Sequence, residues 1–158
     1  MSLIVACRGT HKLWNIDVDR MYIPVYVNLN HWIALCISFV NRHIEVFCCG
    51  GKKKINEVEA FTHFVPSILK AVQSLRMQKH LNITPYTVSC VPMCGLNRSN
   101  FHCGVYTLKY IKCHLLGLDM SLVDDDNIWG TRIKIMWDLW EAASDPELIE
   151  RMTKYEPP

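Results

Sequence analysis

Apolar and polar positions in the first half of the chain form a pattern that predicts three consecutive β-strands. Residues 21–28 are rich in aromatic and β-branched side chains, and Pro24 among them is typical of an edge strand or a bulge. The apolar run over residues 31–40 is typical of a strand buried on both faces. A tight turn at residues 41–42 then leads into a strand over residues 43–49. We therefore expect three strands connected by hairpins.

The second half of the chain is dominated by apolar residues at helical spacing. The elements predicted there are a helix over residues 57–75, a strand over 86–91, a helix over 103–117, a loop or helix cap at 124–127, an amphipathic helix over 133–143 and a helix that begins at 145–147. Pro66 is expected to kink or split the first of these helices. The whole pattern predicts an α+β fold with a mostly antiparallel sheet flanked by helices.

The junction at Cys103 is the most informative local feature, because a polar loop ends there and an apolar helix begins. One apolar face of that predicted helix is formed by Val105, Leu108, Ile111 and Leu115. A cysteine in the first turn lies at the positive end of the helix dipole, which favours the nucleophilic thiolate. A thiol hydrolase also needs a histidine, and His31 stands far upstream at the start of the apolar run. Taken alone, such a cysteine is more often a small core residue, and such a histidine is more often structural.

Length and composition are those of an ordinary globular domain. The chain has 158 residues, of which 50% are hydrophobic, and its formal net charge of +2 is too small to indicate a nucleic-acid partner. The basic run 51–54 is typical of a solvated turn. No segment reaches the roughly 18 consecutive apolar residues of a membrane span, and residues 1–7 lack the order of a signal peptide. We expect an intracellular protein, in the nucleus or the cytoplasm, with no membrane partner.

The eight cysteines are expected to be reduced thiols, since there is no secretory signal. Cys36 lies in the middle of a predicted strand and Cys113 in the middle of a predicted helix, as buried thiols usually do. A zinc-stabilised structural domain is the least favoured alternative, with candidate ligands Cys48, Cys49, Cys90, Cys94 and His102. Their spacing is not that of a zinc knuckle. The expectation is therefore a protein with neither metal nor cofactor.

Three motifs in a fixed order give a resemblance to a known family. They are Trp14-x-x-x-x-Val18-Asp-x-x-Tyr22-Ile-Pro24-Val, Asn30-His-Trp32-Ile and Cys103-Gly-Val105. Together, over about residues 14–142, they resemble the ubiquitin-like-protein-specific proteases, the SUMO-type deconjugating cysteine proteases to which the adenoviral protease is related. The resemblance implies a papain-like architecture, formed by residues 1–158 as a single domain, with the nucleophile at a helix N-terminus. In plants many such domains occur within transposon-derived proteins, which is a candidate setting for this chain.

The resemblance also implies a role for individual residues. Cys103 would be the nucleophile and His31 the general base that takes the thiol proton and later protonates the departing amine. Trp32 would lie beside the channel that admits the narrow diglycine tail of a ubiquitin-like protein. The backbone N–H of Cys103 and the amide side chain of Asn97 would form the oxyanion hole. The implied partners are a ubiquitin-like protein and its conjugates.

The sequence departs from the family at three positions around this site. Cys48 stands seventeen residues after His31, where the family usually has the aspartate of its catalytic triad. A thiol does not stabilise an imidazolium as a carboxylate does, and in serine proteases the loss of that charge costs about 10⁴-fold in rate. Glu45 is no obvious substitute, because it should face the other side of the strand. Asn97 stands where the family prefers glutamine, and His102 where an acidic residue is common.

The start of the chain is a further departure, because only thirteen residues precede Trp14. We expect the domain to lack the family's usual N-terminal portion and to expose apolar surface in consequence. Two functional hypotheses remain. The first is a cysteine peptidase that removes or processes a SUMO-like modifier at its C-terminal diglycine, with activity impaired at Cys48. The alternative is a degenerate, non-catalytic module that binds a ubiquitin-like protein.

Overall fold

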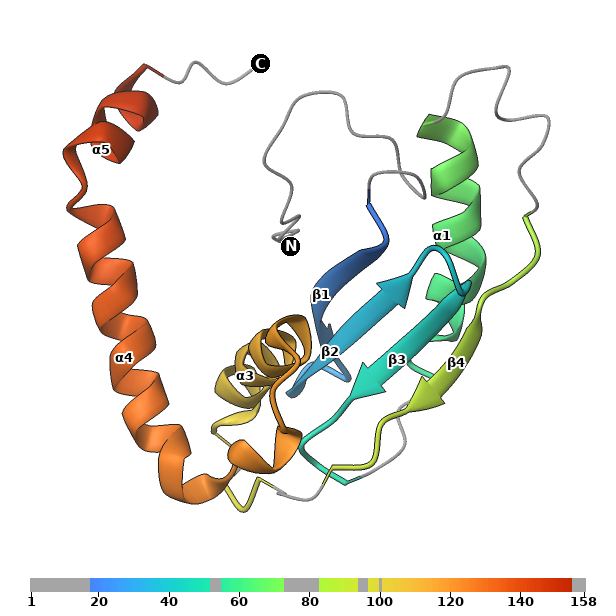
Figure 1. Cartoon of the computed structure of the whole chain (residues 1–158), viewed down its shortest axis with the longest axis horizontal. Coiled ribbons are helices and arrows are strands. Elements are labelled where there is room, and N and C mark those ends of the chain that lie inside the picture. Colours follow the sequence, from blue (N-terminus) through green and yellow to red (C-terminus); the bar gives the residue numbers. More distant parts are fainter. Residues whose placement is uncertain (1–17, 52–54, 73–82, 94–96, 100, 155–158) are drawn as a thin grey trace.

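The structure of the chain is a computed structural model that describes residues 18–51, 55–72, 83–93, 97–99 and 101–154 (Figure 1). Several features of the sequence lie outside these residues. They are the apolar N-terminal segment 1–7, Trp14 of the first motif, residues 52–54 of the basic run, the end of the helix predicted up to residue 75, and Cys94.

Four strands form one sheet in the order β1-β2-β3-β4. Their bounds are β1 Arg20–Val27, β2 His31–Ser38, β3 His43–Phe47 and β4 Thr87–Cys90. The first three strands are antiparallel neighbours, whereas β4 runs parallel to β3. The predicted hairpin-connected triple and the mostly antiparallel sheet are therefore confirmed. Pro24 lies in β1, an edge strand of the described sheet, where a missing N–H is tolerated.

The two hairpin turns contain left-handed backbone. Asn28 and Leu29, between β1 and β2, have φ angles of 50° and 56°, and Arg42, just before β3, has a φ of 52°. Two consecutive residues with positive φ match the right-handed twist of the flanking strands. The polar break predicted after residue 27 and the turn predicted at residues 41–42 are thus present.

The middle strand β2 is buried on both faces because helices cover the sheet from both sides (Figure 1). On one side lies α1 (Glu59–Val72), in a core that includes Ile33, Leu35, Ile37, Ile44, Val46, Val58 and Val65. On the other side lies α3 (Cys103–Leu116), in a core that includes Ala34, Cys36, Phe47, Cys49, Cys103, Tyr106, Tyr110 and Cys113. Alternate side chains of β2 therefore serve two separate cores.

Helix α1 is continuous through Pro66, so this proline does not split the helix, and a kink at Pro66 stays a prediction. A proline has no N–H to donate to the carbonyl four residues earlier, which here belongs to Thr62. The N–H of Tyr86 donates to that carbonyl at 3.1 Å instead. The hydrogen bond lost inside the helix is thus replaced by one that ties the segment before β4 to α1.

The buried face of α3 differs from the apolar face predicted for it. The residues it buries are Cys103, Tyr106, Thr107, Tyr110 and Cys113, whereas Leu108 and Leu115 are exposed. Tyrosine can occupy a core when its hydroxyl finds a partner, and the Tyr106 hydroxyl donates to Asp125 at 2.7 Å. The predicted end of the helix is confirmed, since Gly117 is its left-handed C-cap with a φ of 65°.

The C-terminal part consists of a short 3₁₀ turn η1 (Met120–Leu122) and the helices α4 (Asp125–Ala143) and α5 (Pro146–Thr153). Helix α4 begins eight residues before the predicted start at 133, because Asp124 caps it by accepting the N–H of Asn127 at 3.0 Å. The start predicted for α5 is confirmed, with Asp145 as its cap. Apolar side chains of α4 are exposed, namely Trp129, Ile133, Met136, Trp137, Leu139 and Trp140. Within the described residues, no helix combines the length and apolar character needed to cross a membrane.

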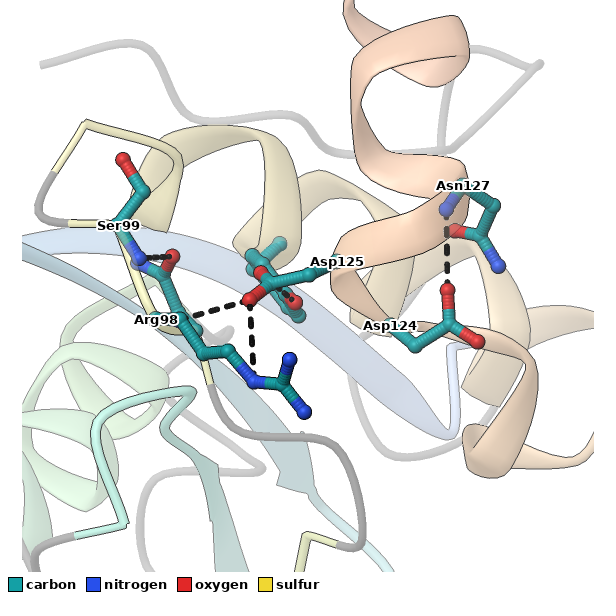
Figure 2. A network of polar contacts seen from close by, with 7 residues as sticks. Arg98, Ser99, Asp124, Asp125 and Asn127 are labelled. Carbon is teal, nitrogen blue, oxygen red and sulfur yellow. Dashed lines mark hydrogen bonds and ion pairs between the residues drawn. The ribbon is translucent and has the colours of Figure 1, made fainter.

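Asp125 joins the start of α4 to α3 and to the loop before it (Figure 2). Its carboxylate accepts the backbone N–H of Arg98 at 3.0 Å and the hydroxyl of Tyr106 at 2.7 Å, and the Arg98 Nε lies 3.9 Å away. Burial, and then the hydrogen bond to Asp125, raise the pKa of the Tyr106 hydroxyl, so this hydroxyl stays protonated and donates. The hydrogen bond from Tyr106 lowers the pKa of Asp125, with smaller contributions from Arg98 and His102.

A pair of leucines tests the packing of β2. Leu35 is 0% exposed in the core beneath α1, whereas Leu29 is 89% exposed in the hairpin turn. We expect Leu35→Ala to lower the free energy of unfolding by about 2–5 kcal/mol, because it removes buried methyl groups and leaves a cavity. The same change at Leu29 should alter stability by no more than about 0.5 kcal/mol. Urea denaturation of the two variants measures both changes in the free energy of unfolding. Equal changes would contradict the burial of Leu35 in this core.

The carboxylate of Asp125 should make stability depend on pH. Since its pKa is lowered by folding, its charged form stabilises the native state at pH values above the ordinary carboxyl pKa of about 3.9. That contribution is lost as the pH falls through the folded-state pKa. We expect Asp125→Asn to lower the melting temperature at pH 7 and to have a smaller effect near pH 3. Asp126→Asn, at an exposed acid in the same helical turn, should have little effect at either pH.

Candidate active site

Cys103 and Trp32 are brought together by the packing of α3 on β2. Cys103 is the first residue of α3 and is 7% exposed, and Gly104 follows it. A Cβ atom placed on Gly104 would lie 3.6 Å from Cδ1 of Trp32, so the indole ring packs directly on the backbone next to Cys103. The other neighbour of the ring is Tyr26, at 5.0 Å between centroids. Trp32 itself is 38% exposed, so it remains at the surface beside the nucleophile candidate.

His31 and Cys48 form the second contact of the site. His31 is the first residue of β2, and Cys48 directly follows β3. The Cys48 Sγ lies 3.4 Å from Nε2 of His31. The residue seventeen positions after His31, where the family usually has an aspartate, is thus a cysteine whose thiol contacts the imidazole. Glu45, rejected from the sequence as a substitute, points to the α3 side of the sheet, where it pairs with His114.

Gly50 lies against this pair, and sequence reasoning gave it no part in the site. A Cβ atom on Gly50 would be 3.5 Å from Cε1 of His31 and 3.7 Å from Sγ of Cys48. The two glycines at 50–51 signalled only the end of a strand. The position of Gly50 over the imidazole depends on the path of the chain after β3, which no local sequence pattern predicts.

Cys49 lies on the other side of the sheet from its neighbour Cys48, in the core that contains Cys103. Burial raises the pKa of the Cys49 thiol to about 12, and the nearby Cys48 and Cys103 add to the rise. The Cys49 thiol therefore stays protonated at neutral pH, and it is a poor nucleophile although it is close to the site.

Asn97 is held beside Cys49 in the segment that leads to α3. Its backbone N–H donates to the carbonyl of Cys49 at 3.0 Å, and its side chain hydrogen bonds to the Cys49 thiol. Its Oδ1 accepts the N–H of Ser99 at 3.0 Å; Ser99 is labelled in Figure 2. Farther along this loop, the rings of His102 and Trp129 lie in a T-shaped arrangement, with centroids 6.3 Å apart. The side chain of Asn97 is thus oriented by contacts on both ends of its amide.

Comparison with known proteins assigns the chain to a family. Residues 4–145 match the C-terminal catalytic domain of the Ulp1 protease family. The ubiquitin-like-specific protease 1A of Arabidopsis thaliana is 22% identical over an alignment of 116 residues, and the match covers 69% of this chain and 21% of that protein. The chain therefore spans about a fifth of the length of this relative.

Solved structures show the same fold. The SUMO protease Ulp1 with its catalytic cysteine oxidised to a sulfonic acid superimposes with a TM-score of 0.52 at 15% identity, covering 73% of this chain and 50% of that one. The form oxidised to a sulfenic acid gives a TM-score of 0.51 at 14% identity, with the same coverage. The α+β, papain-like fold predicted from the sequence is confirmed. The chain belongs to the Ulp1 protease family of cysteine peptidases, as a match to its C-terminal catalytic domain.

Proposed function

We propose that this chain is a cysteine peptidase that removes or processes a SUMO-like modifier at its C-terminal diglycine. The observation that carries the proposal is the placement of Trp32 over Gly104, directly beside Cys103, at the end of the sheet where His31 also lies. Family membership supports the class of enzyme, and the names of the matched proteins point to a ubiquitin-like substrate. The proposal includes a single domain over residues 1–158 and a nuclear or cytoplasmic location.

In the proposed mechanism His31 uses its two ring nitrogens differently. Nε2 faces Cys48, and Nδ1 would accept the proton of the Cys103 thiol. The Cys103 Sγ then attacks the carbonyl carbon of the last glycine of the modifier. The bond from that carbon to the leaving nitrogen breaks, and His31 returns the proton to the departing amine. Water, deprotonated by His31, hydrolyses the thioester and frees both the thiol and the modifier's carboxylate.

Two N–H groups are candidates for the oxyanion hole. The backbone N–H of Cys103 is in the first turn of α3, where N–H groups have no acceptor within the helix. The second is the side-chain amide of Asn97, whose Oδ1 is already held by Ser99. This hydrogen bond fixes which end of the amide carries the N–H donors. The N–H groups of this amide are the proposed second donor to a developing oxyanion.

Trp32 gives the proposed site its preference for a narrow substrate tail. Its indole covers the backbone at Gly104, and the space between them and the nucleophile would suit residues without side chains. A diglycine tail has no Cβ atoms, so the substrate backbone could approach Cys103 closely. Selectivity would then come from shape rather than from charge.

A second candidate function is favoured by one contact, that between Cys48 and His31. A thiol at Nε2 orients the imidazole less firmly than a carboxylate does, and it would stabilise less the imidazolium that forms during catalysis. A domain that keeps the binding surface but lacks this charge could serve as a non-catalytic module for a ubiquitin-like protein. Binding without turnover would identify this function.

An electrophilic probe tests the nucleophile. A SUMO-like modifier whose last glycine carries an electrophile should form a covalent adduct with the wild-type chain, detected by intact-protein mass spectrometry. Cys103→Ala should abolish the adduct, while Cys113→Ala, at a buried cysteine of the same helix, should retain it. His31→Gln should slow labelling about 10²–10⁴-fold, because the general base is lost. Failure of both the wild type and Cys48→Asp to react would exclude catalytic competence.

Restoring a carboxylate at position 48 tests the role of the contact with His31. We expect Cys48→Asp to raise kcat/KM on a modifier precursor by up to about 10⁴-fold, since the carboxylate would stabilise the imidazolium. Cys48→Asn is the matched control, because it has the same shape without the charge, and it should stay near the wild-type rate. Equal rates for the Asp and Asn variants would show that position 48 does not act on His31.

A further inference from the structure

We propose that Cys36, Glu45 and His114 form a binding site for a divalent transition-metal ion of the zinc class, separate from the candidate active site. One sulfur, one carboxylate oxygen and one imidazole nitrogen from these residues all lie within 4.8 Å of one another. None of them belonged to the zinc alternative considered from the sequence. The inference does not depend on the peptidase function.

The strand register places Cys36 and Glu45 next to each other. Tyr22 of β1 pairs with Cys36 of β2, and Cys36 pairs with Glu45 of β3, so the three residues form one row across the sheet. Directly opposed residues in antiparallel strands point to the same face. That face is covered by α3, and His114 in the last turn of this helix contacts Tyr22 and Glu45 of the row. Three different elements therefore converge on one point.

The donor distances are close to those that a small metal ion requires. Nε2 of His114 lies 3.5 Å from Oε2 of Glu45. Nitrogen and oxygen donors bound at about 2.0–2.2 Å to a tetrahedral ion are roughly 3.4 Å apart. Two of the three ligands thus already have the required separation, and the Cys36 sulfur lies within 4.8 Å of both.

Tyr22 supplies the outer support that metal-binding histidines usually have. Its hydroxyl lies 2.8 Å from Nδ1 of His114, which leaves Nε2 as the nitrogen that faces Cys36 and Glu45. The same hydroxyl hydrogen bonds to the Cys36 sulfur and to Arg20. With a metal bound, this oxygen would accept from His114 and Arg20 and donate to the Cys36 thiolate, which uses its one proton and both lone pairs.

The thiol of Cys36 needs a cation to become a ligand. Burial raises the pKa of Cys36 to about 11, and the carboxylate of Glu45 adds to the rise, while the Tyr22 hydroxyl opposes it. Without a metal this sulfur keeps its proton at neutral pH. A bound divalent ion would replace that proton and would also neutralise Glu45.

The set of donor atoms decides the class of metal. Thiolate, imidazole and carboxylate together suit zinc and its neighbours, whereas calcium and magnesium prefer oxygen ligands alone. The side chains of His114 and Glu45 are 21% and 34% exposed, so water can reach the site and fill a fourth position. The competing explanation is a polar network without a metal, in which His114 pairs with Glu45 and the Cys36 thiol hydrogen bonds to Glu45.

Cobalt(II) is the probe that separates these explanations, because thiolate ligation gives it an intense near-ultraviolet charge-transfer band. The 158-residue chain would carry Cys103→Ser and Cys48→Ser, so that the thiols near His31 contribute nothing. We expect the band in this background, its displacement by zinc, and its loss in Cys36→Ala. Glu45→Gln and His114→Gln should weaken cobalt binding strongly, and Tyr22→Phe should raise the Kd about 10–100-fold.

Matched controls lie on the same elements. Cys113→Ala removes the cysteine next to His114 in α3. His43→Gln removes a histidine of β3, whose ring hydrogen bonds to Thr87 and Ser89. Both variants should keep the band and the cobalt Kd of the background. Circular dichroism checks that each variant is folded. If Cys36→Ala does not fold, the cobalt Kd values of the variants at the partly exposed Glu45 and His114 test the proposal instead. Absence of the band, or a Kd unchanged by Glu45→Gln and His114→Gln, would overturn the proposal.

Discussion

The packing of α3 across the middle of β2 is the constraint on which both sites of this molecule depend. The buried tyrosines of α3 fix the helix on the sheet, and its two ends then lie over different strand residues. At the N-terminal end Gly104 meets Trp32, and at the C-terminal end His114 meets Glu45. At 1.5 Å per residue these two ends are about 15 Å apart. A shift of the helix along the strand would therefore disturb both sites at once.

The features that define the fold and those that would set the rate of the proposed reaction are physically separate in this protein. The fold rests on the buried alternation along β2 and on the two helices that pack against its faces. In the proposed mechanism the rate depends on the charge of one group beside His31, where this chain has the thiol of Cys48. Replacing a carboxylate with a thiol changes the volume little, so the core tolerates it, but it removes the charge that an imidazolium needs. Family membership and catalytic power can thus diverge through a single residue.

The sequence predicted the elements well because each has a strong local cause. The apolar run of β2 and the caps Asp145 and Gly117 are visible without any tertiary information. The buried face of α3 could not be predicted, because apolar spacing favours leucines over tyrosines whose hydroxyls find a distant partner such as Asp125. Cys48 and Asn97 were both named by counting residues along a family pattern, whereas the position of Gly50 depends on the path of the loop after β3, which has no local signal.

The Cys36, Glu45 and His114 cluster could not be predicted from the sequence either, because strand register and helix placement together bring these three residues close. In the sequence these residues are separated by 9 and 69 positions and share no motif. A metal bound there would stabilise the native state by about 2.7 kcal/mol at a free concentration one hundred times its Kd. That stabilisation would act on the contact between α3 and the sheet, because the three ligands come from α3, β2 and β3. The helix that carries Cys103 would then be held at its far end by the metal site, while its near end keeps Gly104 against Trp32.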